Sequence, residues 1–318
     1  MNLRTEIKTV VVAGSGVMGA SLAQIFASHG YDVVLYDITQ VQLDKASELI
    51  AINQKTLVEQ GEVSPEFSAE VLGRIHYSLD KDCFRQADFV LETIVERMEV
   101  KQAFFREISE LVAADVVMAT NTSGLSISKL AEAVKEPERF VGMHFVNPPH
   151  LVALVEVIAG EKSLPQTTDI VRVLAESIER EHVTIHKDPP GFLLNRLQFA
   201  IMREAIHIVE SGYASAEDVD KVMKHAMGIR YACVGPFEIM DFGGVDTFYN
   251  ISNYLFADLC DRKDVPDLMR KAFEEGRLGV KSGRGIYDYS GDKAAKAIAR
   301  RDAKLLAVSK CLRNEFTV

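Results

Sequence analysis

The sequence predicts an α/β fold, in which an N-terminal doubly wound parallel sheet with an inserted helical hairpin is followed by an all-α domain. Three observations favour this fold. Short runs rich in valine and isoleucine alternate with segments of helical periodicity from residue 8 to about residue 187. A glycine-rich turn follows the first of these runs. After residues 188–191 the apolar residues keep helical spacing, and runs of β-branched residues almost disappear.

The first half contains seven apolar runs that are expected to be strands of the sheet. They cover residues 8–13, 32–36, 87–93, 115–120, 139–144, 154–158 and 183–186. Helices are expected between them, as the crossover connections of a parallel sheet. The long connection of residues 40–74 is interrupted at Gly61 and again at Ser64 and Pro65, which predicts a pair of helices, the inserted hairpin, instead of a single one.

A domain boundary is expected near residues 188–191, so that a domain of residues 1–187 precedes one of residues 188–318. The second domain is expected to begin with a helix over residues 192–210. Apolar residues recur there at spacings of three and four, and Gly212 follows as a stop. The alanine-rich, basic segment of residues 292–313 is also expected to be helical, with a solvated surface as a simpler interpretation than an anion site.

The composition is that of a globular protein. Of the 318 residues, 47% are apolar and 26% are charged, which excludes a disordered or fibrous chain. A formal net charge of -10 without long basic runs argues against nucleic acid as a partner. The four cysteines lack C-x-x-C spacing, which disfavours a disulfide framework or a zinc site and favours a reducing cytoplasm. No cleavable leader or apolar stretch of membrane-spanning length is visible, so no membrane association is expected.

The glycine-rich turn has the spacing of a dinucleotide-binding site. Gly14, Gly16 and Gly19 follow a predicted strand and open a predicted helix in G-x-G-x-x-G order, with Val17 and Met18 between the last two. The first glycine allows the tight turn, the second lets the backbone approach a pyrophosphate, and the third permits close packing of helix on strand. The unpaired N–H groups of the helix start then favour a phosphate.

Asp37 completes this pattern. It follows the second predicted strand, 18 residues after Gly19, where a carboxylate accepts hydrogen bonds from a ribose 2'-hydroxyl. The same carboxylate repels a 2'-phosphate, so NAD is expected in preference to NADP. The alternative is a tight strand-to-helix turn that binds nothing.

His144 and Glu156 form a second candidate site. His144 ends one predicted strand, and Glu156 stands twelve residues later inside the apolar run LVALVEVI. A carboxylate flanked by valines needs a polar partner if it is buried, and His144 is the natural candidate. The alternative is a packed core histidine and an edge glutamate without a chemical role.

Seven motifs along the chain together resemble those of the L-3-hydroxyacyl-CoA dehydrogenase family. They are GSGVMG (14–19), LETIVERMEVK (91–101), TNTSGLSIS (120–128), HFVNPPHLVALVEVI (144–158), DPPGFLLNRL (188–197), GPFEIMDFGGVD (235–246) and GVKSGRGIYDY (279–289). The resemblance implies a Rossmann-type NAD-binding domain and NAD-dependent interconversion of a secondary 3-hydroxyl group and a ketone. It further implies a short-chain L-3-hydroxyacyl-CoA as the small-molecule substrate and a homodimer formed through the helical domain.

The resemblance also implies roles for single residues. His144 would be the base that takes the hydroxyl proton, and Glu156 would hold its imidazole in one tautomer. Ser123 and Asn195 would hydrogen-bond the reacting oxygen and the neighbouring carbonyl. Asn147, in the family's H-x-x-N-P turn, would support His144.

Three further residues would contact the cofactor. Glu96 and Lys101 match positions that line the nicotinamide ribose, and Asn121 matches one where the inner ribose and ring pass. Each role has an alternative: Asn121 and Ser123 as caps of the helix that begins near residue 126, Asn195 as a polar position at a domain interface, and Lys101 as a solvated side chain.

Two departures from the family pattern bear on the substrate. Residues 40–74 hold three basic residues (Lys45, Lys55 and Arg74) against six acidic ones, a net charge of -3 where relatives acting on coenzyme A carry lysines. Arg230 is an addition that either pairs with a substrate carboxylate or lies on the surface. The same chemistry on a substrate that is not a thioester is therefore an alternative, as in gulonate 3-dehydrogenase or the pyridine-carboxylate 5-dehydrogenase of vitamin B6 breakdown. A non-catalytic nucleotide-binding protein is a remote alternative.

Overall fold

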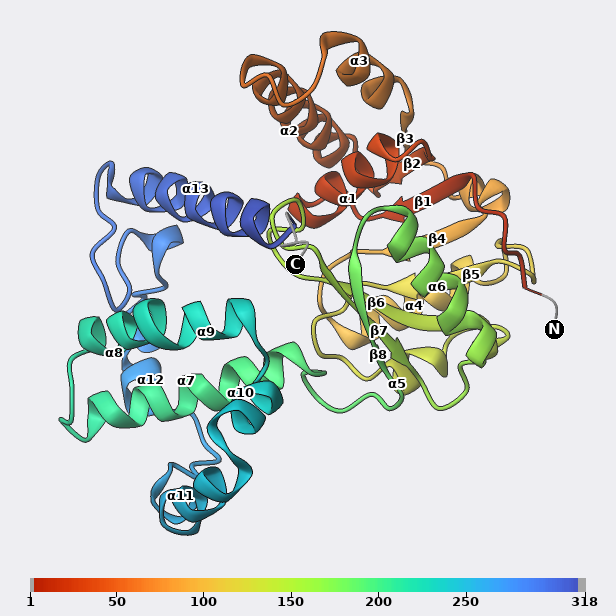
Figure 1. Cartoon of the computed structure of the whole chain (residues 1–318). Coiled ribbons are helices and arrows are strands. Elements are labelled where there is room, and N and C mark those ends of the chain that lie inside the picture. The colour runs from red at the N-terminus through yellow and green to blue at the C-terminus, as the bar shows by residue number, and fades with distance from the viewer. Residues whose placement is uncertain (1–2, 314–318) are drawn as a thin grey trace. The chain divides into compact units, whose positions relative to one another are not determined.

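The computed structural model describes residues 3–313 of the chain. The chain divides into two compact units, Met1–Arg196 and Leu197–Val318 (Figure 1). The division falls in the first turn of helix α7 (Leu194–Glu210), which matches the helix that the sequence predicts over residues 192–210. The α/β class of the first unit and the helical character of the second are both confirmed.

The first unit is built on one eight-stranded sheet with the strand order β3-β2-β1-β4-β5-β6-β7-β8. Its strands are β1 (Thr9–Ala13), β2 (Asp32–Tyr36), β3 (Ile75–Ser78), β4 (Phe89–Glu92), β5 (Val117–Thr120), β6 (Phe140–Phe145), β7 (Leu154–Ala159) and β8 (Glu181–Ile185). All seven expected strands are present, with ends that differ by at most two residues. The strand order reverses at β1, which places a topological switch point between β1 and β4.

The structure differs from the expected sheet in two places. Strand β3, at one edge, was not predicted, because in the sequence IHYS only Ile75 is buried and the run is short. Strand β7 pairs antiparallel with β6, whereas a wholly parallel sheet was expected. Only residues 146–153 connect these two strands, and a crossover to a parallel neighbour needs a dozen or more residues.

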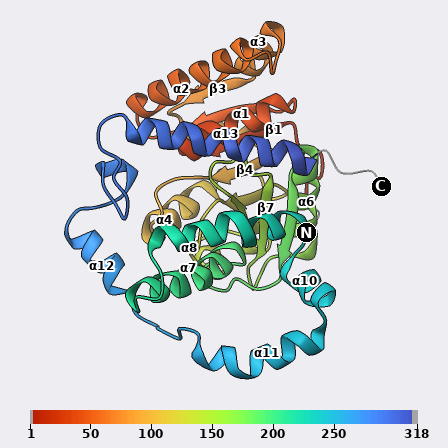
Figure 2. The ribbon, with the colours of Figure 1, turned by 60° about the vertical axis from the view of Figure 1, so that its left-hand side comes forward.

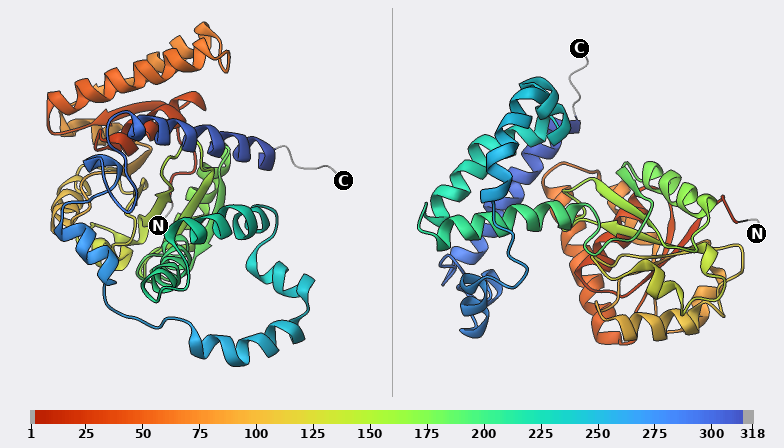
Figure 3. Two further views of the ribbon diagram at one scale, coloured as in Figure 1. Left: turned by 90° about the vertical axis from the view of Figure 1, so that its left-hand side faces the viewer. Right: turned by 90° about the horizontal axis from the view of Figure 1, so that it is seen from below.

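Helices cover both faces of the sheet, as the right-hand view of Figure 3 shows. They are α1 (Val17–Ser28), α2 (Gln40–Glu59), α3 (Pro65–Gly73), α4 (Met98–Ile108), α5 (Ile127–Ala131) and α6 (Pro165–Ser177). Side chains of β1 alternate between two cores: Val10 and Val12 pack with α1, α2 and α6, while Val11 and Ala13 pack with α4 and α5. Burial of both faces explains the nearly continuous apolar run of this strand.

The predicted helical hairpin is confirmed as α2 and α3, which lie side by side in Figures 1 and 2. Each helix has an N-cap whose side chain accepts a hydrogen bond from the first turn, Thr39 for α2 and Ser64 for α3. Pro65 follows Ser64 at the first helical position, where its missing N–H costs nothing. The two helices and the short turns around them form the connection from β2 to β3.

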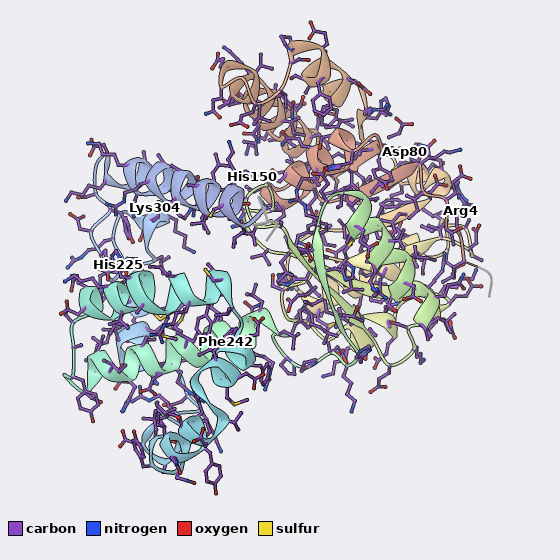
Figure 4. The ribbon with its side chains drawn as sticks, in the orientation of Figure 1. Arg4, Asp80, His150, His225, Phe242 and Lys304 are labelled. Carbon is purple, nitrogen blue, oxygen red and sulfur yellow. The ribbon has the colours of Figure 1, made fainter. Side chains whose placement is uncertain are left out.

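The second unit contains helices and very little core. After α7 come α8 (Ala216–Val222), a π-helical turn (Met223–Met227), α9 (Gly228–Cys233), α10 (Pro236–Gly243), α11 (Val245–Asp258), α12 (Asp267–Glu274) and α13 (Lys293–Arg313). Among its described residues only Ala272 and Gly285 are buried. Large apolar side chains are instead exposed, among them Phe237 (77%) and Phe242 (81%), the latter labelled on α10 in Figure 4. None of the helices in residues 3–313 is long and apolar enough to cross a membrane.

Candidate active site

The glycine turn lies between β1 and α1, as the sequence predicts. A Cβ on Gly19 would be 1.8 Å from the carbonyl oxygen of Gly14, and a Cβ on Gly14 would be 2.9 Å from the backbone of Thr93 and Ile94. These two positions therefore require glycine for packing. A Cβ on Gly16 would meet nothing within 4 Å, and no side chain caps the first turn of α1. The open approach to this backbone fits a pyrophosphate.

Between these glycines, the groups available to contact a cofactor belong to the backbone more than to the side chains. The side chain of Val17 is exposed, and Met18 packs against the core. Asp37 is half-buried beside the turn, where its Oδ2 accepts hydrogen bonds from the backbone N and the Oγ of Ser15, both at 2.8 Å. Ser15 fixes the position of this carboxylate, a role that the G-x-G-x-x-G pattern alone does not reveal.

Lys101 is buried, so its interpretation as a solvated side chain is wrong. The side chain is 1% exposed, and its Nζ lies 2.5 Å from Oε1 of Glu92 and 3.3 Å from Oε2 of Glu96. Glu92 is itself fully buried at the end of β4, and its Oε2 accepts a hydrogen bond of 2.6 Å from Oγ1 of Thr120. Two charged residues are thus paired inside the unit, at the carboxyl end of a central strand.

Glu96 connects Lys101 to the other predicted site residues. Its Oε1 accepts hydrogen bonds from Oγ1 of Thr122 at 2.6 Å and from the backbone N of Ser123 at 2.8 Å. The carbonyl oxygen of Ser123 accepts one from Nδ2 of Asn195 at 2.8 Å. Glu96, Ser123 and Asn195 therefore lie together. The N-cap of α5 is Ser126, so neither Ser123 nor the nearby Asn121 caps this helix.

Asn121 has a structural contact near the candidate base. Its Oδ1 accepts a hydrogen bond of 2.8 Å from the backbone N of Phe145, which joins the ends of β5 and β6 next to His144. Asn147 is exposed and makes no hydrogen bond to His144 within the described residues. Arg230 is exposed on α9, in the second unit.

His144 and Glu156 are directly opposite each other on β6 and β7. Directly opposite residues of an antiparallel pair project to the same face of the sheet and lie close enough to interact. His144 Nδ1 and Glu156 Oε2 are 2.7 Å apart, and both side chains are buried. Since a carboxylate only accepts hydrogen bonds, Nδ1 carries a proton and donates it, so in the neutral imidazole Nε2 is the nitrogen with a free electron pair.

Glu156 is also fixed from its other side. Its Oε1 accepts hydrogen bonds from the backbone N atoms of Leu193 and Leu194, at 2.9 and 2.8 Å. Burial on its own raises the pKa of Glu156, but the hydrogen bonds from His144 and these two N–H groups outweigh it and hold the pKa below its ordinary value. The carboxylate therefore stays ionised. The ring of Phe192, whose centroid is 5.9 Å from that of His144, packs against the pair.

The arrangement combines a dinucleotide turn and a buried histidine–carboxylate pair on one sheet. The ends of β1, β4, β5 and β6 carry the glycine turn, Glu92, Thr120 and His144, and these parallel strands end at the same edge. A histidine whose Nδ1 is fixed by a carboxylate can accept a proton at Nε2 and stabilise the resulting charge. No group of three His, Cys, Asp or Glu side chains that could hold a metal ion occurs in the described part of the chain.

Two family models cover most of the chain. The NAD-binding domain of 3-hydroxyacyl-CoA dehydrogenase matches residues 9–189, and the C-terminal domain of 3-hydroxyacyl-CoA dehydrogenase matches residues 191–289. The C-terminal model ends before α13.

Proteins similar to this chain include enzymes of two different names. A 5-formyl-3-hydroxy-2-methylpyridine 4-carboxylate 5-dehydrogenase of Mesorhizobium japonicum is 36% identical over 96% of this chain and 98% of its own length. A solved structure of an enzyme of that name, described as an NAD+-dependent dismutase, has a TM-score of 0.90 at 34% identity, and the match covers 97% of this chain and 99% of that one. A probable 3-hydroxybutyryl-CoA dehydrogenase of Deinococcus radiodurans is 38% identical over 87% of this chain and 99% of its own. The solved (S)-3-hydroxybutyryl-CoA dehydrogenase of Ralstonia eutropha has a TM-score of 0.76 at 34% identity, with 90% of this chain and all of that one covered.

These matches confirm the resemblance drawn from the seven motifs, and with it NAD as the cofactor. The chain belongs to the 3-hydroxyacyl-CoA dehydrogenase family and is an NAD-dependent oxidoreductase.

Proposed function

We propose that this enzyme reversibly oxidises a secondary 3-hydroxyl group to a ketone, with a short-chain L-3-hydroxyacyl-CoA as its substrate. The buried pair of His144 and Glu156, at 2.7 Å, is the observation that carries the proposal. It supplies a base with a defined tautomer on the same sheet as the dinucleotide turn. The names of several relatives as 3-hydroxybutyryl-CoA dehydrogenases support the thioester as substrate.

In this mechanism Nε2 of His144 accepts the proton of the substrate hydroxyl group. Bound NAD supplies an acceptor for the hydride that leaves the same carbon. The ionised Glu156 stabilises the imidazolium that forms, and in the reverse direction the imidazolium returns the proton to the carbonyl oxygen. Burial of the pair strengthens this electrostatic stabilisation, because the local dielectric constant is low.

Ser123 and Asn195 are the groups proposed to orient the reacting oxygen and the neighbouring carbonyl. The Ser123 hydroxyl is on an exposed residue, and the side-chain amide of Asn195 already donates to the Ser123 carbonyl at 2.8 Å. That hydrogen bond fixes the two residues relative to each other. Correct placement of the hydroxyl carbon opposite His144 is what such contacts contribute to the rate.

The residues proposed to hold NAD are spread over four strand ends. The backbone of Gly14, Gly16, Val17, Met18 and Gly19 would contact the pyrophosphate, because the space over Gly16 is open. Asp37 would accept hydrogen bonds from the adenosine ribose. Glu96, Lys101 and Asn121 would line the nicotinamide half.

A second candidate substrate is a carboxylated compound that is not a thioester, such as a formyl or hydroxymethyl pyridine carboxylate. Two of the three cations of the helical hairpin are already paired, Lys55 with Glu59 at 3.7 Å and Arg74 with Glu70 at 2.9 Å. These cations are poorly suited to bind the phosphates of coenzyme A. The match over nearly the full length of both chains to the pyridine-carboxylate enzyme also favours this candidate. Arg230 would then pair with the substrate carboxylate.

Absorbance of NADH at saturating cofactor tests the proposal. We expect NADH to be consumed with acetoacetyl-CoA, and His144→Ala to lose about 10²- to 10⁴-fold in kcat while it still binds NADH. His182→Ala is a matched control, since His182 also pairs with a glutamate at 2.8 Å, but that glutamate, Glu176, is exposed. Turnover of the pyridine carboxylate without turnover of acyl-CoA would show that the second candidate is the substrate. Arg230→Ala should then raise the KM for the pyridine carboxylate. Full activity of His144→Ala would refute both.

We further propose that the enzyme is a cytoplasmic homodimer whose helical unit forms the interface. Aromatic side chains of α10 and α11 support this: Phe237, Phe242, Tyr254 and Phe256 are 67–81% exposed. Apolar exposure of this kind is typical of surfaces that bind another protein. Light scattering at micromolar concentration should give about twice the mass of one chain, and a monomer would contradict the proposal.

A further inference from the structure

Glu92 occupies an unusual position for a residue without an assigned role. It is fully buried at the carboxyl end of β4, next to the topological switch point of the sheet. Its Oε1 accepts hydrogen bonds from the backbone N of Ile94 at 2.7 Å and from Nζ of Lys101 at 2.5 Å, and its Oε2 accepts one from Oγ1 of Thr120 at 2.6 Å. A buried carboxylate is costly unless it is paired and hydrogen-bonded, and here it is both.

Two of these three contacts do not need a charge. The backbone N–H of Ile94 and the hydroxyl of Thr120 would be satisfied equally well by the neutral side chain of glutamine, since its oxygen accepts and the hydroxyl of threonine can rotate to accept from its amide. Lys101, the one cation among the three, gains most from a carboxylate, and its attraction contributes more to the ionised form of Glu92 than either of the other two hydrogen bonds. The negative charge of Glu92 therefore acts on the ammonium group of Lys101.

Lys101 in turn lies between two carboxylates. Its Nζ is 2.5 Å from Glu92, 3.3 Å from Oε2 of Glu96, and 3.4 Å from the carbonyl oxygen of Ile94. The ammonium group donates hydrogen bonds to Glu92 and to the carbonyl oxygen of Ile94, and its contact with Glu96 is an ion pair. The other oxygen of Glu96 receives the hydroxyl of Thr122 and the backbone N–H of Ser123. The position of Glu96 thus depends on Lys101, and that of Lys101 on Glu92.

We propose that Glu92 is a positioning residue of the cofactor site, which acts through the Lys101 ammonium group to hold Glu96 and the Thr122–Ser123 turn in place for the nicotinamide ribose. Without the charge of Glu92, the ammonium group is attracted by Glu96 alone. The Glu96 carboxylate is then drawn toward Lys101 and away from the turn. The inference rests on the proposed function, because it takes Glu96 as a cofactor contact.

Glu92→Gln is the variant that tests this, because it removes the charge and keeps the shape. We expect the Kd for NADH, measured by fluorescence titration, and the KM for NADH each to rise about tenfold or more, with a smaller change in kcat. Glu107→Gln is the matched control: Glu107 pairs with Lys81 at 2.6 Å on the same helix as Lys101, but in solvent, and its Kd for NADH should stay unchanged.

A double-mutant cycle separates a positioning role from general damage to the fold. If Glu92 acts through Lys101, the effects of Glu92→Gln and Lys101→Met on the Kd for NADH will be far from additive, and the double variant will bind NADH about as weakly as Lys101→Met alone. Additive effects, or a folded Glu92→Gln with the Kd of the wild type, would refute the inference. If Glu92→Gln fails to fold, the charge-balanced double variant carries the test, and binding of NADH by it as tightly as by the wild type would refute the inference. Failure of the proposed function would show differently, as a wild-type protein that does not bind NADH.

Discussion

Replacement of Glu156 by glutamine is expected to abolish most of the activity without unfolding the protein. The variant side chain has the same shape and keeps one oxygen, which can still accept the backbone N–H groups of Leu193 and Leu194 at 2.8–2.9 Å. Its amide NH₂ must then face Nδ1 of His144, which is 2.7 Å away in the wild type. Two N–H groups cannot hydrogen-bond to each other, so the imidazole instead carries its proton on Nε2, and Nδ1 accepts a hydrogen bond from the amide.

A protonated Nε2 cannot accept the proton of the substrate, so the base is in the wrong tautomer. The corresponding change from aspartate to asparagine in a serine protease triad lowers kcat by about 10⁴-fold, which is about 5.5 kcal/mol of transition-state stabilisation. We expect a loss of this size in kcat, measured by NADH absorbance, with the Kd for NADH changed less than threefold, about the limit expected for a change away from the cofactor.

Glu176→Gln is the matched control for this experiment. Glu176 pairs with His182 at 2.8 Å, but its side chain is 57% exposed, and its removal should leave kcat unchanged. If Glu156→Gln kept kcat within about tenfold of the wild type, the tautomer argument would be refuted, since a general base in the wrong tautomer loses more than this. The hydrogen bond between His144 and Glu156 would then have a structural role only.

Three further predictions concern the turn, a thiol and the acid stability of the fold. Gly19→Ala should lower the melting temperature by several degrees or prevent folding, because its Cβ would lie 1.8 Å from a backbone oxygen, whereas Gly16→Ala should fold normally and raise the Kd for NADH. Thermal unfolding and NADH titration distinguish the two, and equal behaviour of both variants would contradict the packing argument. Burial raises the pKa of the Cys83 thiol to about 11, so iodoacetamide at pH 8 should modify the exposed Cys311 and leave Cys83 intact until the protein is unfolded, as peptide mass mapping would reveal. The pKa of Glu156 is lowered from 4.5 in the folded state, so the contribution of this carboxylate to stability is complete above about pH 4.5 and is lost as the pH falls through the lower folded pKa. The difference in unfolding free energy between the wild type and Glu156→Gln should therefore shrink in acid. A difference that stays constant with pH would argue against the ionised carboxylate.

The sequence predicts the strands well, because both faces of most strands are buried and their residues are almost all apolar. Val10, Val11 and Val12 are all fully buried, which is what a continuous apolar run indicates. Strand β3 escapes this logic, since His76 and Tyr77 are exposed at the edge of the sheet. Its place is decided by pairing with β2, a long-range contact that the local pattern of four residues does not encode.

In the candidate site, the sequence predicts the residues with a fixed spacing and misses the groups that position them. The glycines, Asp37, His144 and Glu156 stand out by motif or by a charge in an apolar run. Ser15 and Thr122 do not, because serine and threonine are common in turns, and their hydrogen bonds to Asp37 and Glu96 exist only once distant strand ends meet. The sequence does hold a signal for Glu92, since it ends an apolar run as Glu156 interrupts one.

The reversed strand β7 explains why the histidine and the glutamate meet at all. Met143 and Phe145 on β6, and Val155 and Val157 on β7, face the core that contains α1 and α6, so the residues between them face the other side. A slip of one residue in the pairing of β6 and β7 would turn Glu156 into that apolar core and away from His144. The register depends on the connection of residues 146–153, which is too short for a crossover and leaves the antiparallel return as the available path. The length of this loop is therefore part of the geometry of the proposed base.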